Sequence, residues 1–237
     1  MVKKFNIDIY ADGASLSSIR KLNRLNFIKG FTTNPSLMKK AGVHNYKKFA
    51  RSVLKLVKKK PVSFEVFSDD LKIMEDQARI ISSWGENSYA KIPITNTRGK
   101  KTKDIIKKLS KSGVKINVTA VLTLDQVRDV YNSVSNDADI ILSIFSGRIA
   151  DTGRDPIHLF KKAINICRNK KKIKLLWAST REVLNLYQAE NIRADIITVP
   201  YSILSKLNMY NKNLKKLSLE TVKTFYNDAK KAGFNLN

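Results

Sequence analysis

The sequence predicts a (β/α)8 barrel, or TIM barrel, in which eight parallel strands and the helices between them form one domain. Short runs of β-forming residues alternate with helix-length amphipathic stretches, and eight such runs fit into 237 residues. No linker, low-complexity tract or change of composition divides the chain, so we expect a single domain over residues 1–237. The alternative is a doubly wound open sheet, but the glycine-rich phosphate-binding fingerprint after its first strand is absent from the sequence.

The predicted strands are short apolar runs bounded by polar turns. The second ends at a turn in which Pro35 biases Asn34 away from helix. The sixth is strongly apolar throughout. We expect strands at residues 5–11, 27–32, 62–67, 89–94, 114–122, 138–145, 173–178 and 195–199.

Hydrophobic spacing and first-turn signals predict a helix after each strand. Phe49 and Val53 share one face of the stretch that follows the second strand. Pro156 is suited to a first helical turn, and an acidic first turn begins the helix after the third strand. We expect helices at residues 15–25, 46–59, 69–83, 102–110, 124–134, 156–168, 181–189, 201–207 and 218–232.

One charged residue lies inside an apolar strand, in the segment Tyr89-Ala90-Lys91-Ile92-Pro93-Ile94. Lysine is almost never fully buried unless it is paired or functional. Alternation along the strand turns Lys91 away from the side of Ala90 and Ile92. Inside a closed barrel the amine would lie in a desolvated pocket that suits it to Schiff-base formation. On an edge strand it would reach out to solvent, and the strand by itself leaves both interpretations open.

Polar side chains stand at or just after the ends of seven predicted strands. A barrel carries its active site at the C-terminal ends of its strands, so these side chains would meet at one mouth. Each has a structural explanation when taken singly, since Asp12 could cap a helix and Glu65 could pair with a surface lysine. A buried polar layer drawn from seven strands requires a hydrogen-bonded network or a ligand, which favours a functional site. The residues are Asp12, Thr32, Asn34, Glu65, Lys91, Asn117, Thr119, Ser143, Arg148, Ser179 and Arg181.

At these positions the chain resembles the transaldolase family of Schiff-base-forming barrels. The matching segments follow the family's order, and the length is similar to that of its small members, which include the fructose 6-phosphate aldolases. The resemblance implies a class I aldolase-like barrel. The segments are Thr32-Thr33-Asn34-Pro35-Ser36, Val62-Ser63-Phe64-Glu65-Val66, Lys91-Ile92-Pro93, Asn117-Val118-Thr119, Ser143-Ile144-Phe145-Ser146-Gly147-Arg148-Ile149 and Ala178-Ser179-Thr180-Arg181.

Three positions favour the transaldolases over the aldolases of this family. Aldolase members have Gln in place of Glu65, Tyr in place of Phe145 and no Asn at the position of Asn117. A phenol could hold the water that protonates and releases an enzyme-bound enamine, and a phenylalanine cannot. The chain also departs from the family, with Ile144 in place of a usual Pro and Thr180 in place of a common Phe. The shape of the pocket wall, and so the exact sugar, stays open.

The resemblance also implies a role for each site residue. Lys91 would attack the C2 ketone of fructose 6-phosphate or sedoheptulose 7-phosphate, Glu65 and Thr119 would handle protons through a water, and Asp12 would take the C4 hydroxyl proton. A dihydroxyacetone unit then passes to an aldose phosphate. The alternatives are an aldolase that releases free dihydroxyacetone and a transaldolase acting on a modified sugar phosphate. The implied substrate-binding residues are Thr32, Asn34, Asn117, Ser143, Phe145, Arg148, Ser179 and Arg181.

The cysteine and histidine content is typical of a cytoplasmic protein without a zinc site, and the resemblance implies a reaction without a cofactor. The single cysteine, Cys167, excludes an intrachain disulfide and fits a reducing compartment. No apolar run approaches the roughly 18 residues of a membrane helix. His44 and His158 have no Cys or His partner at the spacing of a zinc site.

The net charge of +25 admits nucleic acid, an anionic membrane or acidic substrates as partners. However, the lysines are spread along the whole chain, and the sequence has no aromatic-interleaved basic stripe and no helix-turn-helix signature. We therefore expect a solvated basic surface that attracts sugar phosphates, rather than a nucleic-acid partner. The resemblance further implies a homo-oligomer, in which residues 217–234 form a helix that packs on the barrel or on a neighbouring subunit.

Overall fold

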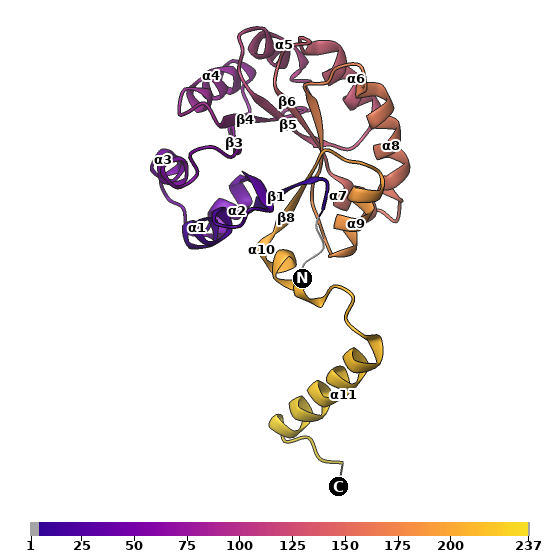
Figure 1. Cartoon of the computed structure of the whole chain (residues 1–237). Helices are drawn as coiled ribbons and strands as arrows, with labels where there is room; N and C mark the ends of the chain where they lie inside the picture. Colours follow the sequence, from indigo (N-terminus) through magenta and orange to yellow (C-terminus); the bar gives the residue numbers. More distant parts are fainter. Residues whose placement is uncertain (1–4, 237) are drawn as a thin grey trace.

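The computed structural model describes residues 5–236, which contain a closed barrel of eight strands (Figure 1). Each strand pairs in parallel with the next along the chain, and β8 closes the barrel against β1. The predicted (β/α)8 barrel is therefore confirmed, and the open sheet is wrong. The strands are β1 (Asp8–Asp12), β2 (Ile28–Thr32), β3 (Val62–Glu65), β4 (Ser88–Pro93), β5 (Ile116–Val121), β6 (Ile140–Ile144), β7 (Ile173–Trp177) and β8 (Ile196–Pro200).

Helices surround the barrel and alternate with its strands (Figure 1). Side chains such as those of Asn45 and Asp70 cap the N-termini of these helices by accepting hydrogen bonds from backbone N–H groups. Two short helices, α2 and α7, form directly after strands where the sequence predicts only polar turns. The helices are α1 (Leu16–Asn23), α2 (Pro35–Lys40), α3 (Tyr46–Leu56), α4 (Leu71–Ser82), α5 (Lys103–Lys111), α6 (Leu124–Ser133), α7 (Ser146–Ala150), α8 (Pro156–Cys167), α9 (Leu184–Asn191), α10 (Tyr201–Leu204), the 3₁₀ helix η1 (Ser205–Met209) and α11 (Leu214–Lys231).

The barrel wall separates two apolar clusters. On the outer side of the strands, the large core includes Phe160 and Trp177, whose rings stack with their centroids 5.7 Å apart. On the inner side, alternate strand residues form a smaller cluster that includes Tyr10, Ile141 and Ile196. This inner cluster fills the middle of the barrel. The polar side chains that follow it along each strand therefore lie at the C-terminal mouth.

The Tyr10 ring fits inside the barrel because Gly30 faces it. A Cβ atom at position 30 would lie only 2.6 Å from carbons of the Tyr10 ring. Burial raises the pKa of Tyr10, so its phenol stays protonated. The phenol thus forms part of an uncharged floor beneath the polar mouth.

The last helix, α11, has no buried residue and extends away from the barrel (Figure 1). It carries a stripe of exposed apolar side chains, which includes Leu219, Val222, Phe225 and Tyr226. These residues recur at helical spacing, which is the pattern of a face that packs against another surface. Among the described residues, no helix is long and apolar enough to span a membrane.

Candidate active site

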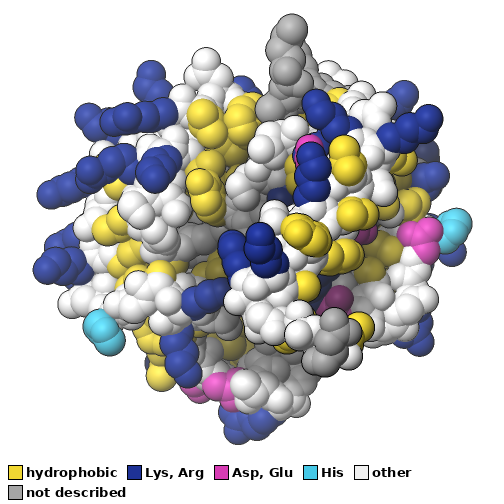
Figure 2. Space-filling view, turned by 90° about the horizontal axis from the view of Figure 1, so that it is seen from below, with side chains coloured by type: hydrophobic (Ala, Val, Ile, Leu, Met, Phe, Trp, Pro, Cys, Tyr) yellow, Lys and Arg dark blue, Asp and Glu magenta, His cyan; other side chains and the backbone are white. Residues whose placement is uncertain are grey.

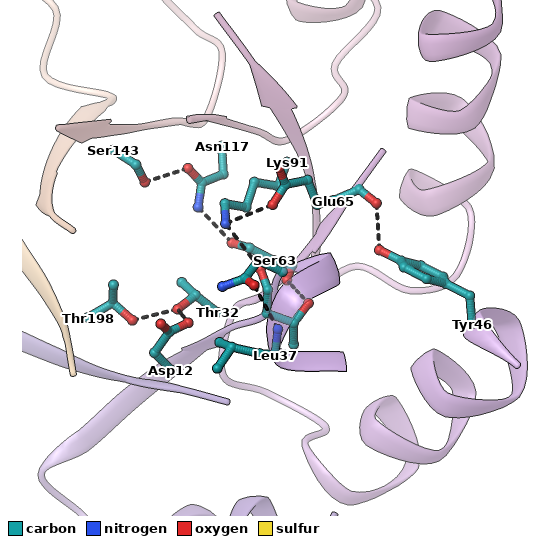
Figure 3. Close-up of polar contacts among 12 residues, drawn as sticks. Asp12, Thr32, Leu37, Tyr46, Ser63, Glu65, Lys91, Asn117, Ser143 and Thr198 are labelled. Carbon is teal, nitrogen blue, oxygen red and sulfur yellow. Dashed lines mark hydrogen bonds and ion pairs between the residues drawn. The ribbon is translucent and has the colours of Figure 1, made fainter. Parts of the chain in front are cut away.

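Most of the polar residues predicted at the strand ends meet at the C-terminal mouth of the barrel, and Figure 3 shows several of them. Neighbouring strands hold them in register, since Asp12 pairs with Thr32, Glu65 with Lys91, and Lys91 with Asn117. Buried polar groups need partners, and most of these side chains bond to one another. The buried members are Thr32, Ser63, Lys91, Asn117, Thr119, Ser143 and Thr198.

Lys91 points into the barrel mouth from β4 and lies close to a carboxylate. Its Nζ is 3.0 Å from Oε2 of Glu65 and donates a hydrogen bond to the Thr33 carbonyl at 3.1 Å. The Lys91 side chain is only 7% exposed, and that of Glu65 is 18% exposed. A closed barrel has no edge strand, so the solvent-reaching interpretation of Lys91 is wrong. The amine is held next to a base that can accept its proton.

Glu65 is anchored through its backbone as well as its side chain. The Tyr46 hydroxyl of α3 donates to the Glu65 carbonyl oxygen at 2.6 Å. Burial and the Glu65 charge both raise the pKa of Tyr46, so this phenol stays a donor. The end of β3 is thereby fixed to the outer helix layer. This contact fixes the backbone from which the Glu65 carboxylate reaches Lys91.

Thr119 presents a hydroxyl that is buried yet has no hydrogen-bond partner among residues 5–236. It lies beside a distortion of β5, because Ala120 has a φ of 60° and the pairing with β6 shifts register between Val118 and Val121. A non-glycine residue in the left-handed region is strained, and such strain concentrates at functional sites. Thr119 is thus a polar group available to a ligand.

The Asn117 amide has a fixed orientation. Its Nδ2 donates to Ser63 Oγ at 3.0 Å, and its Oδ1 accepts from Ser143 Oγ at 2.7 Å. Sequence reasoning missed Ser63, although it stands two residues before Glu65 on the same face of the strand. The three side chains present an ordered set of donors and acceptors from β3, β5 and β6.

Asp12 lies across the mouth from Lys91, at the end of β1 (Figure 3). Thr32 donates to Asp12 Oδ1 at 2.7 Å, and the Thr32 hydroxyl is 2.5 Å from that of Thr198. Burial raises the pKa of Asp12, while the Lys91 charge and the Thr32 hydrogen bond oppose that rise. Sequence reasoning missed Thr198, which interrupts the apolar run of β8 and could have been found by the same strand-end test.

Asn34 and Phe145 each begin a short helix at the mouth. The Asn34 Oδ1 accepts from the Leu37 N–H at 2.9 Å, so its amide oxygen caps α2 while Nδ2 remains as a donor. Phe145 directly precedes α7 and packs against the inner apolar cluster below. The mouth is therefore apolar on the side of Phe145.

Arg148, Ser179 and Arg181 lie apart from the buried network, on α7 and on the segment after β7. Gly147 brings these two segments together, since a Cβ at position 147 would lie 1.7 Å from the Ser179 carbonyl oxygen. Ser179 itself has a φ of 65°. Both arginines are exposed, so the structure gathers two cations beside the mouth.

Arg181 has a partner that the sequence does not predict. Its Nε and Nη2 donate to the two carboxylate oxygens of Asp151 at 3.2 and 2.5 Å. The Arg181 hydrogen bond, followed by the charges of Arg181 and Arg148, lowers the pKa of Asp151. One edge of the guanidinium is thus occupied, and Nη1 remains for an anion.

Among residues 5–236, no group of three or more His, Cys, Asp or Glu side chains is arranged to hold a metal ion. The side chains that the structure brings together are instead an amine, two carboxylates and several hydroxyls and amides. This set can form and protonate a covalent adduct of a carbonyl compound.

Comparison with known proteins agrees with this geometry. The family described as transaldolase/fructose-6-phosphate aldolase matches residues 9–237. The chain belongs to this family. It is 33% identical over 200 residues to a "Probable transaldolase" of Dehalococcoides mccartyi, covering 84% of this chain and 89% of that protein. It is 34% identical over 214 residues to a "Probable transaldolase" of Nitrosopumilus maritimus, covering 90% of this chain and 91% of that protein.

Solved structures add support for the fold of this family member. A crystal structure of KGPDC from Streptococcus mutans has a TM-score of 0.54 and 10% identity, and covers 82% of this chain and 88% of that one. At this identity the likeness shows the barrel alone. The resemblance seen in the sequence motifs is confirmed at the level of the family, and the names of the relatives support an enzyme.

Proposed function

We propose that the protein is a transaldolase, which transfers a dihydroxyacetone unit from a ketose phosphate to an aldose phosphate through a Schiff base. The observation that carries the proposal is the buried Lys91 amine, 3.0 Å from the Glu65 carboxylate. Fructose 6-phosphate and sedoheptulose 7-phosphate are the proposed donors. No cofactor takes part in the proposed reaction, because the iminium itself accepts the electrons of the bond that breaks.

The first step forms the Schiff base. Lys91 passes a proton to Glu65, and its free amine attacks the C2 carbonyl of the ketose to give a carbinolamine. Glu65 returns the proton to the departing hydroxyl, which leaves as water. Thr119, whose buried hydroxyl has no partner among the described side chains, would hold a water within this relay.

Asp12 then acts as the base for carbon–carbon cleavage. It takes the proton of the C4 hydroxyl, the C3–C4 bond breaks, and its electron pair moves into the iminium to give an enamine. An aldose phosphate leaves. Burial raises the pKa of Asp12, which makes its carboxylate a stronger base than an exposed one. Attack of the enamine on a second aldehyde reverses the steps.

The remaining mouth residues would bind the substrate. Asn117, Ser143 and the Nδ2 of Asn34 offer hydrogen bonds to the hydroxyls of the three-carbon unit, and Thr32 holds the base. Hydrogen bonds within the network leave a second lone pair on Asn117 Oδ1 and a second proton on Nδ2. Arg148, Ser179 and Arg181 are the proposed phosphate site, since guanidinium groups donate charge-assisted hydrogen bonds to phosphate.

Phe145 favours transfer over release. The enamine is released as dihydroxyacetone only when a proton reaches its carbon, and the Phe145 ring packed on the apolar floor offers no hydroxyl to hold a protonating water. The alternative functions are an aldolase that releases free dihydroxyacetone and a transaldolase for a modified sugar phosphate. The carboxylate of Glu65, beside Lys91, also favours the transaldolase by resemblance.

The basic surface fits anionic substrates. Figure 2 shows Lys and Arg side chains scattered over one face, with apolar and uncharged side chains between them. Such a distribution attracts small anions without presenting one continuous basic stripe. A nucleic-acid partner stays disfavoured on this reasoning, and a cytoplasmic location stays a prediction.

Dependence on an acceptor tests the proposed reaction against the aldolase alternative. With fructose 6-phosphate as donor, we expect sustained turnover when an aldose phosphate such as erythrose 4-phosphate is added. Without an acceptor we expect at most about one equivalent of aldose phosphate per active site, because the enamine stays on Lys91. Multiple turnovers without an acceptor, with free dihydroxyacetone as product, would establish the aldolase instead.

The phosphate site is tested by Arg181→Ala. We expect KM for a phosphorylated acceptor to rise about 10- to 100-fold, since a charge-assisted contact is lost, with a much smaller change for the unphosphorylated aldehyde. Arg168→Ala removes an exposed arginine from the end of α8 and serves as the matched control. An equal rise in KM for both aldehydes would remove Arg181 from the phosphate site.

We also propose that the protein is a homo-oligomer in which α11 packs on a neighbouring subunit. The exposed apolar stripe of α11 motivates this, since Phe225 is 69% exposed. Sedimentation of the full chain is expected to show an oligomer, and Phe225→Ser to shift it toward smaller species. Asn227→Ser, on the opposite side of the helix, should leave the oligomer intact. A monomeric full chain would contradict the proposal.

A further inference from the structure

The eighth strand contributes a hydroxyl that the proposed reaction does not use. Thr198 lies on β8, which neighbours β1 in the closed barrel, and it is 5% exposed. Its Oγ1 is 2.5 Å from Oγ1 of Thr32, and Thr32 in turn donates to Asp12 Oδ1 at 2.7 Å. A chain of two hydrogen bonds therefore runs from β8 through β2 to the carboxylate on β1 (Figure 3).

The number of available protons fixes the direction of both bonds. A carboxylate can only accept, and each hydroxyl has one proton to donate. When Thr32 gives its proton to Asp12, the contact between the two threonines requires Thr198 as the donor. The Thr198 hydroxyl thereby occupies a lone pair of Thr32 and keeps the Thr32 proton directed at Asp12.

The same chain can reverse when Asp12 gains a proton. A protonated carboxyl can donate to Thr32, and the Thr32 hydroxyl then rotates to donate to Thr198. Neither change requires a heavy atom to move. In the proposed reaction this proton comes from the C4 hydroxyl of the donor and returns when the enamine attacks the acceptor. The two threonines thus accommodate both states of the base.

We propose that Thr198 is a positioning residue that acts on Asp12 through Thr32 during carbon–carbon cleavage. The kinetic role rests on the proposed function, whereas the hydrogen-bond chain does not. Without the Thr198 hydroxyl, Thr32 no longer accepts the hydrogen bond that polarises its own O–H, so its bond to Asp12 weakens and the charged form of Asp12 loses stabilisation. Because the Thr32 bond opposes the effect of burial, weakening it moves the pKa of Asp12 further upward.

Substitution of Thr198 leaves the titratable groups around Asp12 in place. The charge of Lys91 lowers the pKa of Asp12, and that of Glu65 raises it. On β8 itself (Ile196–Pro200) no side chain is charged. The other titratable groups on elements near Asp12 are Asp8 and Tyr10 on β1, Lys29 on β2, and Lys40 and Tyr201, which line with Asp12 a cavity of about 300 Å³.

A carboxyl titration of the free protein tests the hydrogen-bond chain directly. Carbon-13 NMR of labelled aspartates follows Asp12, with its signal assigned by Asp12→Asn. We expect the titration midpoint of the Asp12 carboxyl to move to higher pH in Thr198→Val, which removes the hydroxyl but keeps a similar side-chain shape. In Thr198→Ser the midpoint should return to the wild-type value. Thr102→Val loses a different buried hydroxyl, bonded to the Pro93 carbonyl, and should leave Asp12 unchanged. An unshifted midpoint in Thr198→Val would overturn the proposal.

Cleavage kinetics test the role in the reaction. We expect Thr198→Val to lower kcat about 3- to 10-fold and to move the acid limb of the pH profile upward, since Asp12 acts as a base only when deprotonated. Thr198→Ser should restore both. If kcat of Thr198→Val falls but the acid limb of its pH profile does not shift, and Thr198→Ser does not restore kcat, Thr198 has only a structural role. That result would contradict the proposal. If Thr198→Val does not fold, Thr198→Ala carries the same comparison.

The two tests separate this inference from the proposed function. The NMR midpoint reports on the free protein and needs no turnover. A wild-type protein that transfers no three-carbon unit would therefore refute the proposed reaction while the Asp12 titration still decides the hydrogen-bond chain.

Discussion

The site depends on the contact between Lys91 and Glu65 inside a closed barrel. Removing two charges from water is costly, and the pair is tolerated only because its partners are close and well oriented. Loss of one partner from a buried pair typically costs about 3–5 kcal/mol. Parallel pairing sets this contact, because Glu65 and Lys91 are register partners on adjacent strands. The strand register of the barrel thus places the proposed nucleophile, the Lys91 amine, beside its proposed proton acceptor, the Glu65 carboxylate.

The hydrogen-bonded network around Lys91 and Glu65 also depends on closure of the barrel. Closure points the inward side chains of all eight strands toward one mouth, where side chains of adjacent strands and of strands one further apart can reach each other. Asn117 lies between Ser63 and Ser143, and Asp12 is linked through Thr32 to the β8 threonine, Thr198. These bonds hold the side chains in fixed positions, as the proposed electrostatic catalysis requires. The apolar floor beneath them keeps water from entering the barrel from below.

Much of this arrangement could be predicted from the sequence, because it follows from strand periodicity. A polar residue inside an apolar run, such as Lys91 or Asn117, indicates an inward position at a strand end. Contacts between residues far apart in the chain could not be predicted in this way. The pairing of Arg181 with Asp151 depends on the close approach of α7 to the segment after β7, which only the fold reveals.

In the proposed reaction, Lys91 carries the three-carbon unit as a covalent adduct. Borohydride reduction in the presence of fructose 6-phosphate, followed by peptide mass mapping, tests it most directly. Borohydride reduces the iminium, so we predict one reduced adduct, of the donor or of its three-carbon unit, on the peptide that contains Lys91. We predict none in the Lys91→Met variant, which keeps a side chain of similar length without an amine. No increase in the mass of that peptide, or an adduct on another lysine, would contradict the proposed role of Lys91.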